Sequence, residues 1–534
     1  MDGGSGRWWR EAVLYQVYPR SYQDSDGDGV GDLPGIVDRV DYLEWLGVDA
    51  VWLSPIFRSP QADFGYDISD YRAVDPLFGS RADLDALRDA LHDRDMRLLL
   101  DLVPNHSSEE HPWFRASRSS RDDPKRDWYI WADPAPDGGP PNNWLSVFGG
   151  SAWEWDEATG QYYYHAFLKE QPDLNWRNPE VRAAMLDVMR HWLDWGADGF
   201  RVDVMWHLIK DEGLRDNPPN PDYDPATADL SYDRLLPAYS TDQPEVHDVV
   251  AEMREVVDAY GDRLLIGEIY LPVEQLVQYY GPRGNGAHLP FNFQLILLPW
   301  ERERIEAAIN EYEAALPEDA WPNWVLSNHD KPRVAGRWGE AAARAAAVLL
   351  LTLRGTPTVY YGDELGIGTV DIPEDRVRDP QALRDPGSPT RDAFRTPMQW
   401  RPGPHAGFSG SEPWLPLTGD AATRNVATQR DDPASMLALY RDLLALRRRE
   451  PALVHGGFEP LPGQGPVLAY VRAHEDDRIL VLVNFDDAPA TFRPVSPARG
   501  EILLSTADTR GSMEGGVRLS PHEALVIRLS APVR

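Results

Sequence analysis

Apolar runs of strand length recur along the chain, and segments with the spacing of amphipathic helices separate them. The eight predicted strands are 13–18, 50–53, 97–102, 199–203, 264–268, 289–293, 324–327 and 356–361. Strands and helices in alternation favour a parallel sheet. Eight such units would close a (β/α)8 TIM barrel, whose reactive groups gather at the carboxyl ends of the strands. We therefore predict an α/β fold of this class.

Two long intervals interrupt the alternation. The interval 104–198 is too long for one connection, and its first part is rich in Trp, Tyr, Pro and Gly. A second irregular segment, about 367–416, follows the eighth strand. Long aromatic-rich loops on the catalytic face of a barrel usually shape a substrate site. The predicted domains are a barrel at 1–103 and 175–450, a small domain inserted after strand three at 104–174, and a C-terminal antiparallel β domain at 451–534.

The last part of the chain begins with a helical pattern at 433–449. Pro433 suits the first helical position, Pro451 suits a stop, and three consecutive arginines fall in the last turn, where cations complement the helix dipole. Beyond it, 478–485 and 523–529 alternate or stay apolar at strand length. This pattern predicts a terminal domain built of strands.

Composition narrows the function classes. The 534 residues include 86 Asp and Glu against 53 Lys and Arg, a formal net charge of -33, and no cysteine. Such a surface repels nucleic acid and anionic membrane, and disulfides and thiolate chemistry are excluded. The first twelve residues lack a signal-peptide core, and the longest apolar run, 345–351, is far shorter than the ~20 residues of a membrane span. We expect a cytoplasmic monomer or homodimer that acts on a small molecule, without organic cofactor.

Three acids, Asp203, Glu268 and Asp330, each end or closely follow an apolar strand-like run. Arg201 and Asp203 share a face, because side chains two apart on a strand point the same way. Alone, that pair is more often a structural ion pair. Three acids at the ends of three separate strands indicate that all three line one opening of the barrel.

These acids suit the cleavage of an acetal such as a glycosidic bond, which requires one carboxyl to protonate the leaving oxygen and one carboxylate to meet the cationic carbon. Asp203 would be the nucleophile and Glu268 the acid, ~5 to 5.5 Å apart in a retaining enzyme. Arg201 would keep Asp203 ionised, whereas Glu268 needs burial or a nearby anion to stay protonated. Asp330 would grip sugar hydroxyls as positive charge develops.

Two histidines stand beside this set. His106 follows the third strand and His329 precedes Asp330, so that neutral imidazoles could bond sugar hydroxyls. For either histidine alone, a purely structural role is the commoner reading. We expect Asp101 and Asn105 to support loop geometry without touching substrate.

Six motifs in order now carry a resemblance. They are DLVPNH (101–106), QPDLNW (171–176), GFRVDV (199–204), LLIGEIY (264–270), LSNHD (326–330) and GTPTVYYGDE (355–364). The chain resembles α-glucosidases of glycoside hydrolase family 13, the α-amylase superfamily, in its oligo-1,6-glucosidase, maltase and trehalose synthase branch. The resemblance implies a retaining, exo-acting α-glucosidase with Asp203 as nucleophile, Glu268 as acid and base, and Asp330 as transition-state stabiliser.

The resemblance also implies roles for residues around the first glucose. Those expected to line its pocket are His106, Phe148, Phe167, Arg201 and His329. Tyr66 resembles the family's stacking platform, and Asp63 with Arg395 resembles the pair that holds the outer hydroxyls and closes the pocket. Without the motifs, Tyr66 and Phe148 would more simply be core aromatics.

A loop near the start of the chain places acids at alternate positions, Asp24, Asp26, Asp28 and Asp32, with glycines between them. Calcium prefers such convergent oxygens. The twelfth position is Gly35, so the loop is not an EF-hand. Members of the resembling family bind calcium here with the carbonyl of Val30, which implies a structural Ca²⁺; an acidic loop without metal is the alternative.

Two positions bear on the substrate. Val204 after the nucleophile resembles members that prefer α-1,6 linkages, and Lys331 departs from the glutamine that this branch often has after the third acid. A transglucosylase, a trehalose synthase-like isomerase or a sucrose-acting enzyme would use the same three acids and stays an alternative. Phosphorylated disaccharides and a catalytically dead binding relative are disfavoured.

Overall fold

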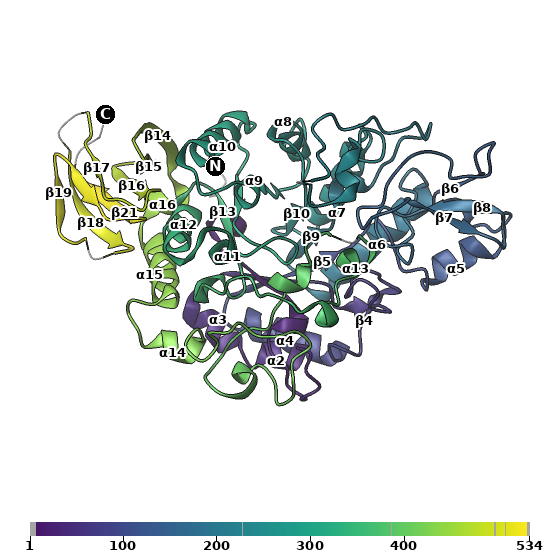
Figure 1. The fold of residues 1–534 in the computed structure, drawn as a ribbon, viewed down its shortest axis with the longest axis horizontal. Coiled ribbons are helices and arrows are strands. Elements are labelled where there is room, and N and C mark those ends of the chain that lie inside the picture. The colour runs from purple at the N-terminus through teal and green to yellow at the C-terminus, as the bar shows by residue number, and fades with distance from the viewer. Residues whose placement is uncertain (1–6, 227, 386, 496–497, 508, 531–534) are drawn as a thin grey trace.

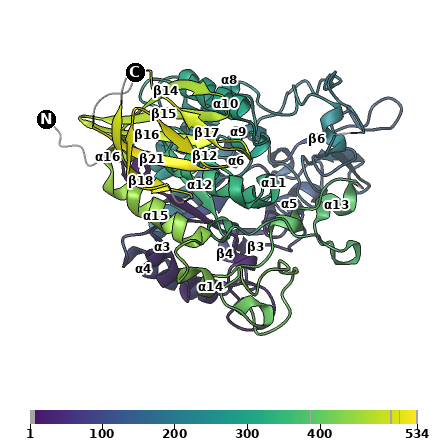
Figure 2. The ribbon, with the colours of Figure 1, turned by 60° about the vertical axis from the view of Figure 1, so that its left-hand side comes forward.

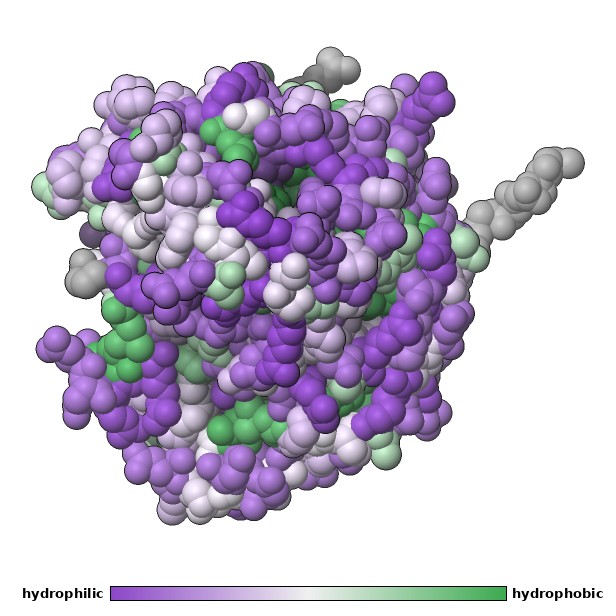
Figure 3. Space-filling model, turned by 90° about the vertical axis from the view of Figure 1, so that its right-hand side faces the viewer, coloured by the Kyte–Doolittle hydropathy of each residue, from purple (hydrophilic) through white to green (hydrophobic). Residues whose placement is uncertain are grey.

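The computed structural model describes residues 7–226, 228–385, 387–495, 498–507 and 509–530. Figure 1 shows three regions: a parallel barrel in the centre, a segment with three short strands on the right, and an antiparallel sheet on the left. Hydrophilic residues cover most of the face seen in Figure 3, and hydrophobic residues there form separate small groups.

The eight barrel strands are all parallel, and seven hydrogen-bonded pairings run in the order β11, β10, β9, β5, β2, β1, β13, β12. Their bounds are β1 (Leu14–Val17), β2 (Ala50–Leu53), β5 (Arg97–Leu102), β9 (Gly199–Val202), β10 (Leu264–Gly267), β11 (Leu289–Pro290), β12 (Asn323–Val325) and β13 (Thr356–Tyr360). Each falls within or one residue from a predicted strand. The predicted (β/α)8 barrel is confirmed.

Helices between the strands bury one apolar stripe against the barrel. The main ones are α2 (Leu33–Val37), α3 (Val40–Leu46), α4 (Arg81–His92), α6 (Pro179–Trp195), α7 (Val246–Asp258), α10 (Arg302–Ala315) and α12 (Glu340–Thr352). In α4, Leu84, Leu87 and Leu91 supply the buried stripe, and a capping box between Ser80 and Asp83 fixes the first turn. The apolar run at 345–351 lies within α12, whose residues from Ala345 to Thr352 are all buried.

Shorter elements occupy the loops. They are α1 (Trp8–Glu11), α5 (Pro112–Ser119), α8 (Val273–Leu276), α9 (Gln294–Leu297), α11 (Val334–Trp338), α13 (Pro380–Arg384), α14 (Val426–Arg430), β3 (Phe57–Arg58) and β4 (Asp70–Val74). No helix among the described residues combines the length and the apolar character needed to cross a bilayer.

The segment after the third barrel strand forms a sheet of β6 (Trp131–Ala132), β8 (Gln161–Tyr164) and β7 (Trp153–Asp156). Its many aromatic residues pack on one another: the rings of Phe114 and Trp131 are stacked 5.8 Å apart, and Tyr163 meets both edge-on. Aromatic packing of this kind gives a small sheet a core of its own.

Two sets of contacts fasten this segment to the barrel. At its base, the Lys210 ammonium lies 2.5 Å from Asp173 and donates to the Asn105 amide oxygen, all three side chains being buried. Further out, residues 142–144 exchange hydrogen bonds with 214–217 of the loop after β9. The inserted segment is therefore tied down along its length.

The C-terminal region is an antiparallel sheet in the order β14, β15, β16, β21, β18, β19, with a separate β17 and β20 pair. The bounds are β14 (Gly457–Gln464), β15 (Val467–His474), β16 (Asp477–Asn484), β17 (Ala490–Phe492), β18 (Arg499–Ser505), β19 (Ser512–Glu514), β20 (Val517–Leu519) and β21 (Ala524–Leu529). The predicted antiparallel β domain is confirmed. It packs on α12, as the turned view in Figure 2 shows.

The predicted helix before this sheet ends at Arg449 as expected, but it begins three residues later than Pro433. It is α15 (Met436–Arg449), and Ser435 caps it by accepting a hydrogen bond from the Ala438 N–H, so Pro433 lies outside. Serine at the N-cap stabilises the helix more than proline two residues earlier could. Pro451 does not merely follow the stop: it opens the next helix, α16 (Pro451–His455).

One of the three arginines in the last turn of α15 does more than complement the helix dipole. Arg447 is buried and donates to the main-chain carbonyls of Leu351 and Gly355. Arg472 of β15 likewise donates to the carbonyls of Thr352 and Gly456. Arg447 therefore joins the end of α12 to α15, and Arg472 joins the end of α12 to the C-terminal sheet.

Candidate active site

The three acids predicted to work together lie at the carboxyl ends of barrel strands. Asp203 follows β9 and Glu268 follows β10, which are hydrogen-bonded neighbours with Gly267 opposite Val202. Asp330 comes five residues after the end of β12. Asp203 and Glu268 are buried, whereas 23% of the Asp330 side chain is exposed.

Arg201 links the acids. Its Nη1 donates to Asp203 Oδ1 at 2.8 Å and to Asp101 Oδ1 at 2.9 Å. Its Nη2 lies 2.7 Å from Glu268 Oε2, close enough for an ion pair but without hydrogen-bond alignment. The guanidinium is completely buried over the Trp52 ring. One cation thus holds three carboxyl groups around itself.

Burial and the one cation act in opposite directions on the pKa values of the acids in this cluster. Burial raises the pKa of Asp203 well above its ordinary value, with Arg201 opposing, and burial likewise raises the pKa of Glu268. Burial raises the pKa of Asp101 to about 6. Glu268 adds to the upward shift of the Asp203 pKa, so the two carboxyl groups titrate as an interacting pair. A carboxylate beside a carboxylic acid is what an acid and nucleophile require.

Asp330 has the opposite environment. Burial would raise its pKa, but His329, Arg395 and Arg391 outweigh burial and hold the pKa well below the ordinary range. Arg395 Nη2 donates to Asp330 Oδ1 at 2.7 Å, and Arg391 Nη1 lies 3.2 Å from the same oxygen. Asp330 therefore stays ionised.

His329 contacts two tyrosine rings beside Asp330. Its ring lies nearly parallel to Tyr66, with planes 3° apart, and to Tyr18, with planes 21° apart. Its Nδ1 is 2.9 Å from the Gln16 amide nitrogen and its Nε2 is 2.7 Å from the Tyr66 hydroxyl. With Gln16 as donor, the proton of the neutral ring is on Nε2. Burial lowers the pKa of His329 to about 3.

His106 lies on the inserted-segment side of the site. Its Nε2 contacts the Tyr66 carbonyl and the Gln171 side chain, both at 3.1 Å. Burial lowers the pKa of His106 to about 3, so the ring is neutral near pH 7. Gln171 also donates to Asp63 at 3.3 Å. Gln171 belongs to the QPDLNW motif, which was the available signal, but it was not predicted as a site residue.

Asp63 and Arg395, which the resemblance implies together hold the outer glucose hydroxyls, bond different partners in the structure. Asp63 pairs with Arg391 at 2.9 Å, whereas Arg395 bonds Asp330 and the His329 carbonyl. Arg391 also pairs with the buried Asp379 at 2.8 Å. The sequence prediction missed Arg391, although it stands four residues before Arg395.

The two predicted phenylalanines lie together. Phe148 and Phe167 meet edge-on at 5.5 Å, the Arg391 guanidinium lies over Phe148, and Phe167 packs beside His106. Val204, next to the nucleophile, is buried and donates its N–H to Glu268. The structure therefore brings every predicted substrate-binding residue into one connected network with the three acids.

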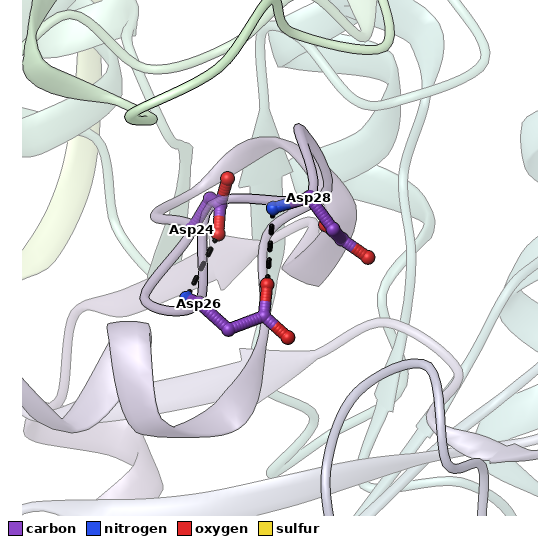
Figure 4. A group of neighbouring side chains, drawn as sticks. All are labelled: Asp24, Asp26 and Asp28. Atoms are coloured by element: carbon purple, nitrogen blue, oxygen red, sulfur yellow. Dashed lines mark hydrogen bonds between the residues drawn. The ribbon is translucent and has the colours of Figure 1, made fainter.

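The acidic loop near the start of the chain converges only in part (Figure 4). Asp24, Asp26 and Asp28 each place one carboxylate oxygen within 4.8 Å of the others. Asp32 stands apart from that trio: it caps α2 through the Gly35 N–H and accepts from Ser25. Burial, then the neighbouring acids, raises the pKa of Asp28.

A cavity of about 830 Å³ lies elsewhere, at the amino ends of the strands. Trp9, Arg10, Arg254 and His288 line it with residues around them, and none of the predicted site residues does.

Comparison with known proteins adds independent observations. A family model described as the alpha amylase catalytic domain matches residues 16–456, and one of a domain of unknown function matches 456–526. A probable alpha-glucosidase of Rhizobium meliloti is 42% identical, covering 93% of this chain and 94% of that protein. An oligo-1,6-glucosidase of Halalkalibacterium halodurans is 39% identical, covering 98% and 99%.

Solved structures agree. The alpha-glucosyl transfer enzyme XgtA superposes with a TM-score of 0.92 at 40% identity, covering 98% of this chain and 99% of that one. The trehalulose synthase MutB from Pseudomonas mesoacidophila superposes with a TM-score of 0.91 at 35% identity, covering 99% and 100%.

Proposed function

The chain belongs to the α-amylase family of glycoside hydrolases, and from this premise we propose that it is a retaining, exo-acting α-glucosidase. It releases terminal α-D-glucose from the non-reducing end of short oligosaccharides or α-glucosides. The observation that carries the proposal is the contact of Arg201 with both Asp203 and Glu268, with Asp330 in the same network.

The reaction proceeds in two displacements. Glu268 gives its proton to the glycosidic oxygen as Asp203 attacks the anomeric carbon, so the bond to the leaving sugar breaks and a glucosyl ester forms. Glu268 then takes a proton from water, whose oxygen attacks the same carbon and frees Asp203. Asp330 stabilises the positive charge that builds on the ring in both steps.

The ion pair of Asp63 with Arg391 supports exo action. Both side chains are buried beside Asp330, and Gln171 and Phe148 contact them. Charged groups fixed there would bond the outer hydroxyls of one glucose and leave no room for a longer chain. We propose that this pair closes the pocket beyond the first sugar.

A glucosyl-transferring or isomerising activity is the second candidate. Both XgtA and the trehalulose synthase share the fold at 35% identity or more, and such enzymes differ in what intercepts the glucosyl ester. Time courses with maltose, isomaltose and sucrose, scoring free glucose against new disaccharides, separate the two. Mostly free glucose supports hydrolysis, and mostly new disaccharide favours transfer.

We propose a structural Ca²⁺ in the acidic loop. The gathered carboxylates of Asp24, Asp26 and Asp28 fit a hard cation, and the Val30 carbonyl and Asp32 are next along the same loop. When bound, the ion would neutralise acids that otherwise repel one another. We further propose a cytoplasmic location and a monomeric or homodimeric state, which a chain without cysteine allows.

The direct test is Asp203→Ala. Without the nucleophile we expect kcat to fall by roughly 10⁴-fold or more while circular dichroism and Tm show a folded protein. Added azide should restore part of the rate on an activated glucoside, because it can attack the anomeric carbon from the side that Asp203 occupied, opposite the leaving group. The matched control is Glu212→Ala, an exposed acid in the loop after β9. A folded Asp203→Ala protein with near-normal turnover would refute the assignment.

A further inference from the structure

Val204 has a backbone conformation that valine seldom takes. Its φ is 36° and its ψ is 49°, in the left-handed region, and its side chain is buried. A β-branched residue is crowded there, and such strain persists only where the surroundings over-determine it. Because this strained residue follows the proposed nucleophile, we asked which contacts its conformation makes possible.

The segment that holds Val204 grips Glu268 at three points. The Glu268 N–H donates to the Val202 carbonyl at 2.9 Å, and the Met205 N–H donates to the Glu268 carbonyl at 3.2 Å. The Val204 N–H donates to Glu268 Oε2 at 2.9 Å. The first two contacts fix the main chain of Glu268, and the third, made by the left-handed residue, fixes its carboxyl group.

These contacts distinguish the two carboxyl oxygens. Oε2 faces the Val204 N–H and also lies 2.7 Å from Arg201 Nη2. An oxygen that already accepts one N–H and stands beside a cationic guanidinium is a poor place for a proton, because the bound hydrogen and the positive charge both disfavour it. The proton that Glu268 carries as an acid therefore belongs on Oε1.

We propose that Val204 is a positioning residue for the acid and base of the proposed glucosidase: its main-chain N–H holds Oε2 of Glu268, so that Oε1 carries the proton to the glycosidic oxygen. This inference rests on the proposed function. It concerns the peptide group of Val204, and it is separate from any effect of its side chain on linkage preference.

The test removes that one N–H. In the full-length protein, the valine at 204 is replaced by its α-hydroxy acid through nonsense suppression, which turns the amide into an ester. Aryl α-glucosides of similar size with phenols of different acidity, and α-glucosyl fluoride, serve as substrates. A general acid contributes roughly 10² to 10⁴-fold, mostly for poor leaving groups.

We expect kcat/KM for phenyl α-glucoside to fall about 10-fold or more, less for the para-nitrophenyl compound, and within about twofold for the fluoride, which hardly needs an acid. The alkaline limb of the pH profile should also move to higher pH. The N–H favours the charged carboxylate, so its loss raises the pKa of Glu268.

The matched control is the same ester at Met205, whose N–H meets only the Glu268 main-chain carbonyl. It should lower Tm without changing the leaving-group dependence or the alkaline limb. The inference is overturned if the ester at 204 leaves both the leaving-group dependence of kcat/KM and the alkaline limb of the pH profile unchanged. It is also overturned if the ester lowers kcat/KM equally on every substrate, the fluoride included.

Two further results keep the inference testable. If the ester at 204 does not fold, neutron diffraction of the unaltered protein decides: a deuteron on Oε1 supports the inference and one on Oε2 overturns it. A wild-type protein that releases glucose from none of these glucosides overturns the proposed function and this inference with it, which distinguishes that failure from the others.

Discussion

At the scale of single residues, Arg391 holds more of the pocket together than any one acid. It contacts Asp63, Asp330 and Asp379 with one guanidinium, and the Arg391 side chain is itself buried. Removing one partner of a buried ion pair leaves an uncompensated charge, which costs about 3 to 5 kcal/mol.

We therefore predict that Arg391→Gln lowers the free energy of unfolding by about 3 kcal/mol, as measured by urea denaturation. It should also lower kcat/KM on para-nitrophenyl α-glucoside by about 10²-fold, because Asp63 and Asp330 lose their placement. Arg384→Gln is the control, since the 3.8 Å pair of Arg384 with Glu170 is partly exposed and contributes less than about 1 kcal/mol. Equal effects of the two changes would contradict this role.

The pH dependence of activity follows from the same neighbourhood. The pKa of His329 is lowered to about 3, so the ring stays neutral from pH 5 to 8 and adds no limb there. On this account activity rises with pH as the carboxyl pair loses its first proton, which frees Asp203, and falls as the second leaves Glu268. His329→Asn should reduce kcat without moving either limb in a full pH profile; the disappearance of one limb would show that His329 titrates.

Sequence reasoning found the acids because strand periodicity fixes where a strand ends and which way its last side chains point. Periodicity placed Asp203 and Glu268 at neighbouring strand ends, and the resemblance to the family implied their roles. The partner of Asp63 could not be chosen in this way, because Arg391 and Arg395 stand four residues apart in an irregular loop and only tertiary packing decides which one reaches it.

At the scale of elements, the acidic loop joins the end of η1 (Pro19–Ser21) to α2. Ser409, from the irregular segment 367–416, donates a hydrogen bond to Asp24 in this loop. The loop thus fastens two distant parts of the chain. An ion bound there would add its binding free energy to folding.

We predict that prolonged chelation lowers Tm by several degrees, that Ca²⁺ restores it, and that elemental analysis finds about one ion per chain. Asp28→Asn should give a low Tm that chelation no longer changes. The control is Asp122→Asn, on an exposed turn. An unchanged melting temperature together with an absence of bound metal would remove the calcium proposal.

Element boundaries show where sequence rules compete. All barrel strands were predictable because each is a short buried run bounded by turn residues. For α15 two rules conflicted: proline favours the first helical turn and serine favours the cap, and the hydrogen bond from Ala438 to Ser435 decided for serine. The burial of Arg447 was unpredictable, since its carbonyl partners lie about ninety residues away.

At the scale of the whole molecule, the barrel and the C-terminal sheet share a polar seam. Arg472 donates to the carbonyls of Thr352, Gly456 and Gly457, and the Thr352 hydroxyl bonds the Tyr470 hydroxyl. Buried carbonyls that lose their donors cost about 1 to 3 kcal/mol each when unsatisfied.

We predict that Arg472→Met lowers the free energy of unfolding by about 3 kcal/mol, with a matching fall of Tm in calorimetry. Activity per folded molecule should stay unchanged, since Arg472 is remote in the fold from the acids. The control is Arg478→Met on the neighbouring strand, whose pair with Glu459 is partly exposed. Equal stability of the two variants would contradict a stabilising seam.

The fastening of the inserted segment has one last consequence. Its base is held by Lys210 and its outer part is hydrogen-bonded to the loop after β9, so the inserted segment is fixed to the barrel at two places. We expect this edge of the pocket to keep its outline when a disaccharide binds. Selection among glucosides would then depend on the fit of the substrate to that outline, and a wider substrate range would require substitution of the side chains that form it.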